Sequence, residues 1–166
     1  MKPIAIVYGS TGNNTREVAK KLAAQLPGST LMDVASLKIS DLDAYDNLIF
    51  GTSTWGVGEI QDDWDGFLSQ LKKSNMEGKI VALFGLGDSA SFPDTFTNGM
   101  GILFKALQST GCTFVGSVST AGYDFEDSLS VQGDHFVGLA LDEDNESEQT
   151  DARISAWLEV VLPGFK

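Results

Sequence analysis

The first candidate for chemistry is a run of small polar residues between an apolar and an amphipathic segment, VYGSTGNNTREVAKKL at residues 7–22. A helix that begins near Asn14 or Thr15 leaves its first backbone N–H groups free, and its N-terminus carries roughly half a positive charge. Gly9 and Gly12 let the backbone approach a ligand closely. The stretch therefore predicts a phosphate-binding loop, whose side-chain donors are Ser10, Thr11, Asn13, Asn14 and Thr15.

The same residue types also cap helices, so an ordinary N-cap is the simpler alternative. Seven small or polar residues in succession exceed what one cap needs, and this favours an anion site. The loop contains neither GxxxxGK[ST] nor GxGxxG, since its glycines are spaced GxxG. A nucleoside triphosphatase and a dinucleotide-dependent dehydrogenase are therefore disfavoured.

Two further glycine-rich loops each carry an aromatic residue. Trp55 lies in GTSTWGVGEIQDDW at residues 51–64, and Phe92 lies in FGLGDSASFPDTF at residues 84–96. Either ring alone could be a hydrophobic plug over the end of a strand. An exposed aromatic ring is costly unless it meets a flat partner, so the pair predicts two walls of a slot for a planar ligand.

These loops need a scaffold that brings them together. Apolar runs predict strands near residues 4–8, 47–51, 79–85 and 113–118, with a weaker one at 30–34. Apolar residues spaced i, i+3, i+4 predict four intervening helices, on Val18, Leu22 and Leu26; Trp64, Phe67, Leu68 and Leu71; Met100, Leu103, Phe104 and Leu107; and Ile154, Trp157, Leu158 and Val161. This alternation predicts a doubly wound α/β fold with a mostly parallel sheet, in which ligands bind at the carboxyl ends of the strands.

One segment breaks the alternation. Residues 121–151 contain ten acidic residues and no Lys or Arg, with the apolar run HFVGLAL embedded in them. We interpret this segment as an excursion that interrupts the last strand and then returns to it. Tyr123 and Phe125 are predicted to anchor the excursion by packing.

Composition excludes several classes of protein. The 166 residues fit one domain, and a net charge of −12 makes nucleic acid and anionic membranes poor partners. No apolar run approaches the ~20 residues that span a bilayer, and Met1-Lys2-Pro3 leads directly into strand-like sequence, so we expect a cytoplasmic protein. Cys112 is the only cysteine, which excludes an internal disulfide and favours a packing role.

Taken together, the three loops and the acidic segment resemble a flavodoxin of the long-chain type over essentially the full chain. The matching stretches are YGSTGNNTREVA, GTSTWGVGEIQDDW, ALFGLGDSASFPD, STAGYDFEDS and FVGLALDEDN. The resemblance implies one FMN-binding domain over residues 1–166. It further implies a five-stranded parallel sheet of order 2-1-3-4-5 with helices on both faces, an insertion that interrupts strand 5, and one non-covalent FMN.

The resemblance also implies the cofactor contacts. They are Ser10, Thr11, Gly12, Asn13, Asn14 and Thr15 in the first loop; Thr52, Ser53, Thr54, Trp55, Gly56, Val57 and Gly58 in the second; and Leu86, Gly87, Asp88, Phe92, Thr95, Thr97 and Asp144 in and beyond the third. No catalytic or metal-ligating residue is implied.

The chain departs from the family pattern in both parts of this site. Gly12 stands where a hydroxyl is usual and Asn13 where Gly is usual, so one phosphate hydrogen bond is expected to move to another donor. Asn tolerates left-handed backbone angles, which lets Asn13 keep the loop's shape. Phe92 replaces a Tyr, which keeps stacking and loses the phenol. Gly56 follows the inner aromatic residue and is expected to let the next peptide flip at low cost when the flavin takes up one electron.

The expected function is low-potential, one-electron transfer by a monomer that is not itself an enzyme. Its acidic surface is expected to dock on basic surfaces of redox enzymes: a nicotinamide-dependent flavodoxin reductase, a pyruvate oxidoreductase, nitrogenase or a photosystem. The alternative is a flavodoxin-like FMN-dependent quinone or flavin reductase. A signalling receiver domain needs an acidic pair after the first strand, where this chain has Tyr8-Gly9-Ser10.

Overall fold

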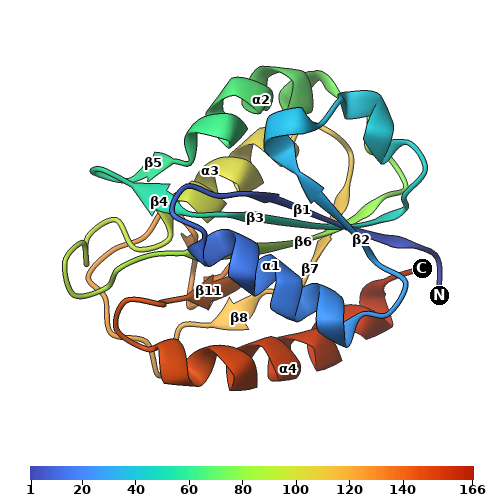
Figure 1. Cartoon of the computed structure of the whole chain (residues 1–166). Helices are drawn as coiled ribbons and strands as arrows, with labels where there is room; N and C mark the ends of the chain where they lie inside the picture. The colour runs from blue at the N-terminus through green and yellow to red at the C-terminus, as the bar shows by residue number, and fades with distance from the viewer.

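A computed structural model describes residues 1–166 (Figure 1). Its helices are α1 (Asn14–Gln25), α2 (Asp62–Lys73), α3 (Asn98–Leu107) and α4 (Thr150–Val161). Its longer strands are β1 (Ile4–Gly9), β2 (Thr30–Asp33), β3 (Asn47–Thr52) and β6 (Ile80–Leu86). Its shorter strands are β4 (Thr54–Trp55), β5 (Glu59–Ile60), β7 (Thr113–Val115), β8 (Val118–Ser119), β9 (Val131–Gln132), β10 (His135–Phe136) and β11 (Leu139–Leu141).

The main sheet is parallel and has the predicted order. β2, β1, β3 and β6 are neighbours, and β1 pairs with β3 over its whole length, from Ile4 opposite Asn47 to Gly9 opposite Thr52. Beyond β6, one strand position is shared by β7 and β11. When these two pieces are counted as strand 5, the order is 2-1-3-4-5, which confirms the doubly wound fold class.

The fifth strand is interrupted, as predicted. β7 pairs with residues 80–82 of β6, and β11 pairs with residues 84–86 of the same strand. Between them, residues 116–138 leave the main sheet and form a small sheet of order β8-β10-β9. We call residues 116–138 the insertion.

Two predicted boundaries need correction. The strand expected over 113–118 ends at Val115, because Gly116 adopts a left-handed backbone conformation with φ +87° that turns the chain out of the sheet. The excursion expected over 121–151 is shorter at its C-terminal end. Residues 139–149 instead contain β11 and the segment that leads into α4, which begins at Thr150, and this segment shares the insertion's acidic composition.

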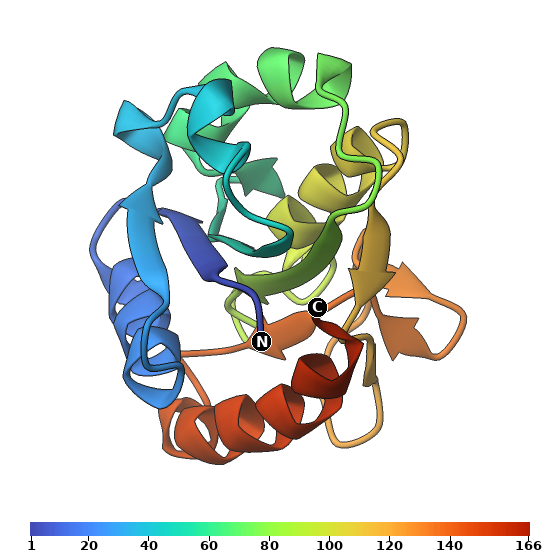
Figure 2. The ribbon, with the colours of Figure 1, turned by 90° about the vertical axis from the view of Figure 1, so that its right-hand side faces the viewer.

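Side chains of the strands alternate between two apolar clusters, one on each face of the sheet. In β1, Ala5 and Val7 join the cluster that contains residues of α2 and α3, while Ile4 and Ile6 join the cluster that contains residues of α1 and α4. Figures 1 and 2 show the two corresponding helix layers. The helical periodicities in the sequence thus identified the buried faces correctly.

The parallel strands bring the three candidate loops to one edge of the sheet. In Figure 1 the loop after β1, the β4–β5 hairpin and the loop after β6 all lie on the left, opposite the two chain termini. The termini are joined by a hydrogen bond from Lys2 N to Lys166 O of 2.7 Å.

None of the four helices combines the length and the apolar character that crossing a membrane requires. Cys112 is partly buried against the core cluster that includes α3, and burial raises the pKa of its thiol. A raised pKa leaves little reactive thiolate at neutral pH, in agreement with the predicted packing role.

Candidate functional site

The loop between β1 and α1 keeps its shape through two consecutive left-handed residues, Gly12 with φ +78° and Asn13 with φ +73°. Asn13 is the N-cap of α1, yet its side chain makes no capping hydrogen bond. The N-cap side chain therefore leaves the N–H groups of Asn14 and Thr15 without the usual cap. The prediction that Asn13 would adopt the left-handed conformation is confirmed.

The loop hydroxyls divide into two kinds. Ser10 Oγ accepts a hydrogen bond from Arg16 N at 3.3 Å, and Thr11 Oγ1 accepts one from Gln61 Nε2 at 3.3 Å. Thr15 is 1% exposed, and its Oγ1 has no hydrogen-bond partner. A buried hydroxyl without a partner is destabilising, so this atom indicates a ligand group beside the start of α1.

The inner wall of the site is the β4–β5 hairpin. Trp55 is 45% exposed, and its Nε1 donates to Ser53 Oγ at 2.7 Å. A Cβ on Gly12 would lie 3.9 Å from the Trp55 ring, so the loop after β1 and the β4–β5 hairpin are adjacent. The turn after Trp55 contains Gly56 with φ +54° and Gly58 with φ +97°, both in the region that favours glycine.

The outer wall is the loop after β6, where Phe92 is 46% exposed. Its backbone N–H donates to Asp88 O at 2.9 Å, and Asp88 Oδ1 accepts from Ser91 N at 3.0 Å. The bond from Ser91 N lowers the pKa of the Asp88 carboxyl. A turn closed in this way fixes Phe92 at the same sheet edge as Trp55.

Between the two walls is a cavity of about 380 Å³. The predicted cofactor residues that line it are Thr11, Gly12, Asn14, Thr15, Ser53, Thr54, Trp55, Gly56, Leu86, Gly87, Asp88, Phe92 and Asp144. Most members of all three predicted loops thus share one cavity, although their sequence positions span more than a hundred residues.

The other predicted contacts lie around the cavity and not on its wall: Ser10, Asn13, Thr52, Val57, Gly58, Thr95 and Thr97. Thr97 is fully buried, and its hydroxyl faces Ser128 Oγ at 3.4 Å. Thr52 donates to Ser53 O at 3.0 Å. Thr95 Oγ1 is buried without a partner, beside Gly58. Thr52 and Thr97 therefore support the loops from within.

The cavity also has an acidic rim. Glu143 lines it and was absent from the predicted set, although the run ALDEDN at residues 140–145 places Glu143 next to Asp144. Single oxygens of Asp88, Asp142 and Asp144 lie within 4.8 Å of one another. Partial desolvation, together with the charges of Asp88, Asp142 and Glu143, raises the pKa of the Asp144 carboxyl.

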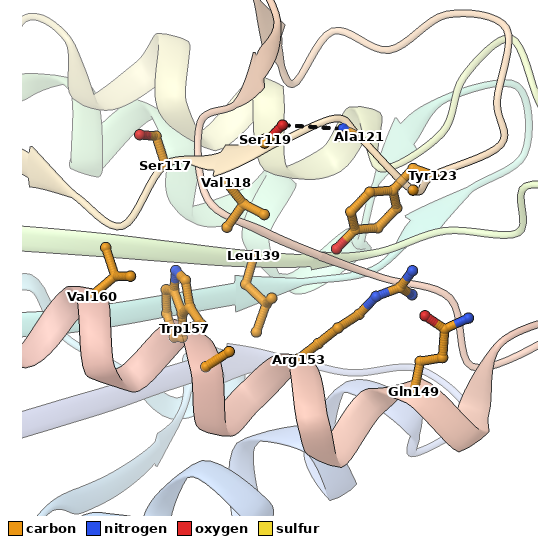
Figure 3. Close-up of a pocket in the computed structure, with 12 residues that line it drawn as sticks. Ser117, Val118, Ser119, Ala121, Tyr123, Leu139, Gln149, Arg153, Trp157 and Val160 are labelled. Atoms are coloured by element: carbon orange, nitrogen blue, oxygen red, sulfur yellow. Dashed lines mark hydrogen bonds between the residues drawn. The ribbon is translucent and has the colours of Figure 1, made fainter.

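A second cavity, of about 430 Å³, lies between α4 and the insertion and shares no residue with the first (Figure 3). Beside this cavity the Tyr123 hydroxyl donates to Ala140 O at 2.8 Å, and the Arg153 guanidinium lies 4.2 Å from the centre of the Tyr123 ring. Trp157 Nε1 donates to Gly116 O at 2.8 Å. Together with the rings of Phe125 and Phe136, these contacts confirm the predicted packing role of Tyr123 and Phe125.

Known proteins resemble this chain over its whole length. The flavodoxin family model matches residues 6–157. A flavodoxin of Synechocystis sp. is 40% identical over 98% of both chains, and one of Trichodesmium erythraeum is 43% identical over 99% of both. The crystal structure of Fusobacterium nucleatum flavodoxin bound to flavin mononucleotide superposes with a TM-score of 0.95 at 30% identity, covering 100% of both chains. The chain therefore belongs to the flavodoxin family.

Proposed function

We propose that residues 1–166 form a single FMN-binding domain that carries electrons between redox enzymes. The observation that carries this proposal is the cavity itself. Two exposed aromatic rings stand beside a helix whose N-cap side chain makes no capping hydrogen bond and beside a buried hydroxyl without a partner. A structural neighbour with the same fold is bound to FMN. These features fit a ligand with a planar ring at one end and a phosphate at the other.

At the phosphate end, the start of α1 supplies backbone N–H groups and the positive end of the helix dipole. Thr15 Oγ1 adds a donor that no group of the protein uses. The cavity is also lined by Thr11 and Asn14 of the same loop. These groups would take over the role of the hydroxyl that is missing at Gly12.

At the ring end, Trp55 and Phe92 provide apolar faces that stack on a flat heteroaromatic ring and exclude water from it. Bound FMN supplies the redox chemistry, since its ring accepts electrons one at a time or in pairs. Gly56, already left-handed, lets the peptide after Trp55 reorient so that a backbone group can pair with the ring. The acidic rim disfavours additional negative charge on the ring, which makes the reduced cofactor a stronger electron donor.

Membership of the flavodoxin family makes this protein an electron carrier and not an enzyme, and no feature of the cavity specifically favours the quinone or flavin reductase alternative. We propose that its redox partners present basic docking surfaces, because the chain carries a net charge of −12. A flavodoxin reductase, a pyruvate oxidoreductase, nitrogenase and a photosystem are the candidate classes. Nucleic acid and membranes are not proposed as partners. Cytoplasmic location and a monomeric state stay predictions.

The test is reconstitution followed by anaerobic photoreduction. FMN added to the apoprotein should bind with a stoichiometry of one, and stepwise reduction should pass through a long-wavelength absorbing intermediate before bleaching. A protein that does not take up FMN would contradict the proposed cofactor. Direct bleaching without an intermediate would contradict single-electron transfer and favour the reductase alternative.

A further inference from the structure

Asp142 directly follows β11 and is a fully buried carboxylate at the cofactor edge of the sheet. Four donors converge on it. Oδ2 accepts from Ser89 N at 3.1 Å and from Ser89 Oγ, while Oδ1 accepts from Asn145 N at 3.0 Å and Asn145 Nδ2 at 3.0 Å. Every one of these donors belongs to a loop, so the carboxylate ties two loops to the end of the sheet.

One of the two loops is the outer wall of the cofactor cavity. Ser89 lies between Asp88, which lines the cavity, and Phe92, whose N–H donates to Asp88 O. Asn145 Nδ2 also donates to Asp88 Oδ1 at 2.9 Å. The backbone before the wall is held by a bond from Gly87 N to Leu141 O of 3.0 Å. Asp142 thus holds the segment that presents Phe92.

Electrostatics alone would disfavour a carboxylate here. Asp142 forms no salt bridge, and carboxylate oxygens of Asp88 and Asp144 lie within 4.8 Å of it. Burying a charge beside like charges is unfavourable unless hydrogen bonds compensate. A carboxylate accepts hydrogen bonds on both of its oxygens. An Asn side chain of nearly the same shape would replace one oxygen by an N–H₂ group, which would then face either the two N–H donors of Asn145 or the N–H and O–H donors of Ser89. The geometry requires acceptors on both sides.

We propose that Asp142 is a positioning residue, which clamps the outer loop through Ser89 so that Phe92 is preorganised to stack on the cofactor ring. This inference rests on the proposed function, because its readouts need bound flavin. The clamp acts on the ring end of the site only, so the phosphate end should not sense its loss.

The test compares four variants, Asp142→Asn, Ser89→Ala, Ser89→Thr and Asp144→Asn, by titrating each apoprotein with FMN and with riboflavin, which lacks the phosphate. Removing a negative charge beside an anionic cofactor should by itself tighten FMN binding. The Asp144 carboxylate makes no hydrogen bond, so Asp144→Asn removes only its charge. This variant should therefore raise FMN affinity by up to about threefold. If Asp142 acts as a clamp, Asp142→Asn should instead lower FMN affinity.

We expect Asp142→Asn to weaken riboflavin binding by about tenfold, with the stoichiometry unchanged at one. FMN binding should weaken by up to about threefold less, because the lost charge partly offsets the lost clamp. Ser89→Ala should weaken both by about threefold to tenfold, and Ser89→Thr, which keeps the hydroxyl, should restore the affinity. At saturating FMN, the visible circular dichroism of the bound ring should change in Asp142→Asn and Ser89→Ala and not in Ser89→Thr.

Affinity in Asp142→Asn equal to or tighter than that of the wild type, with Ser89→Ala also unchanged, would overturn the clamp. If Asp142→Asn does not fold, as judged by far-ultraviolet circular dichroism, the uncharged Ser89→Ala and Ser89→Thr pair decides by itself. A wild-type protein that fails to bind FMN would instead contradict the proposed function, so the two failures are distinguishable.

Discussion

At the scale of single residues, the hydroxyls of the loop after β1 differ in whether they have a partner within the protein, and we propose that the one without a partner binds the phosphate. Ser10 and Thr11 accept hydrogen bonds from within the chain, whereas Thr15 Oγ1 is buried without a partner. A buried polar group without a partner lowers the stability of the apoprotein, and only a hydrogen bond to a ligand offsets this cost. Stability and affinity should therefore respond to Thr15 in opposite directions.

Replacing Thr15 with Val removes the hydroxyl and keeps the shape of the side chain. We expect the apoprotein to gain about 1 kcal/mol in its free energy of unfolding, because an unsatisfied buried group is lost. FMN affinity should fall about tenfold, since a hydrogen bond to a charged phosphate is lost, while riboflavin affinity should not change. Urea unfolding and cofactor titration measure the two effects. Thr15→Ser is the control, and FMN binding as tight in Thr15→Val as in wild type would contradict the assignment.

The raised pKa of the Asp144 carboxyl gives a pH-dependent prediction. A carboxyl group whose pKa is higher in the folded state than in the unfolded state makes the protein lose stability as pH rises from the unfolded value through the folded one. Asp144→Asn removes this loss. At pH 7 the variant should have a higher free energy of unfolding than the wild type. Near pH 3 the two apoproteins should have equal stability, because Asp144 is then protonated in both the folded and the unfolded wild-type protein (about pH 3 lies below the usual pKa of Asp). An equal difference at both pH values would contradict the shift.

The sequence predicted residue types better than residue pairings. The run of small polar residues identified the loop. Nothing in that run shows that the Thr15 hydroxyl has no hydrogen-bond partner, whereas the Thr11 hydroxyl accepts from Gln61, fifty positions away. Glu143 was missed for a similar reason, since a solvated acidic run and a cavity rim have the same composition. Pairing of this kind depends on tertiary structure, which periodicity does not encode.

At the scale of elements, β1, β2, β3 and β6 were predictable from their apolar runs, and all four helices from the helical spacing of their apolar residues. The β4–β5 hairpin and the β8-β10-β9 sheet consist of strands of two residues each, and two residues carry no period. The end of β7 was missed for another reason. Gly116 leaves the sheet, and the apolar Val118 that follows imitates a continuing strand.

Substituting Gly116 therefore tests how the chain leaves the main sheet after β7. Its φ is +87°, and a Cβ there would lie 2.7 Å from Trp157 Nε1, the atom that donates to Gly116 O. Gly116→Ala should lower the free energy of unfolding by more than about 2 kcal/mol, because it adds a clash and a lost hydrogen bond to the strain of a left-handed Ala.

Gly122 is the matched control for this prediction. It has a similar φ of +85°, but a Cβ there meets nothing within 4 Å. Gly122→Ala should therefore cost only the backbone strain, about 1 kcal/mol. Chemical denaturation of the two apoproteins gives both values. Equal losses would mean that the contact of Gly116 with Trp157 contributes nothing at the point where the insertion leaves the sheet.

At the scale of the whole molecule, several acidic residues lie at the sheet edge where the cavity opens. α2 starts beside the β4–β5 hairpin with Asp62, Asp63 and Asp65 in its first turn, and its Lys72 and Lys73 lie at the far end. Asp88, Glu143 and Asp144 line the cavity itself. A partner that reaches the exposed aromatic rings therefore meets several carboxylates, within a chain of net charge −12.

This distribution predicts opposite salt dependences for two kinds of electron acceptor. Reduced protein should transfer electrons to a basic cytochrome at a rate that falls about tenfold as ionic strength rises from about 10 mM to 300 mM, because screening removes attraction beyond the Debye length. Transfer to ferricyanide, a small anion, should accelerate over the same range, because screening removes repulsion. Stopped-flow mixing measures both rates on one preparation.

The two acceptors control for each other, since salt effects on the cofactor's own potential would change both rates in the same direction. Neutralising the first turn of α2 with Asp62→Asn and Asp63→Asn should flatten both dependences while the fold is retained. Rates that respond identically to salt for the cation and the anion would mean that the acidic edge does not steer encounters. The charge would then serve solubility alone.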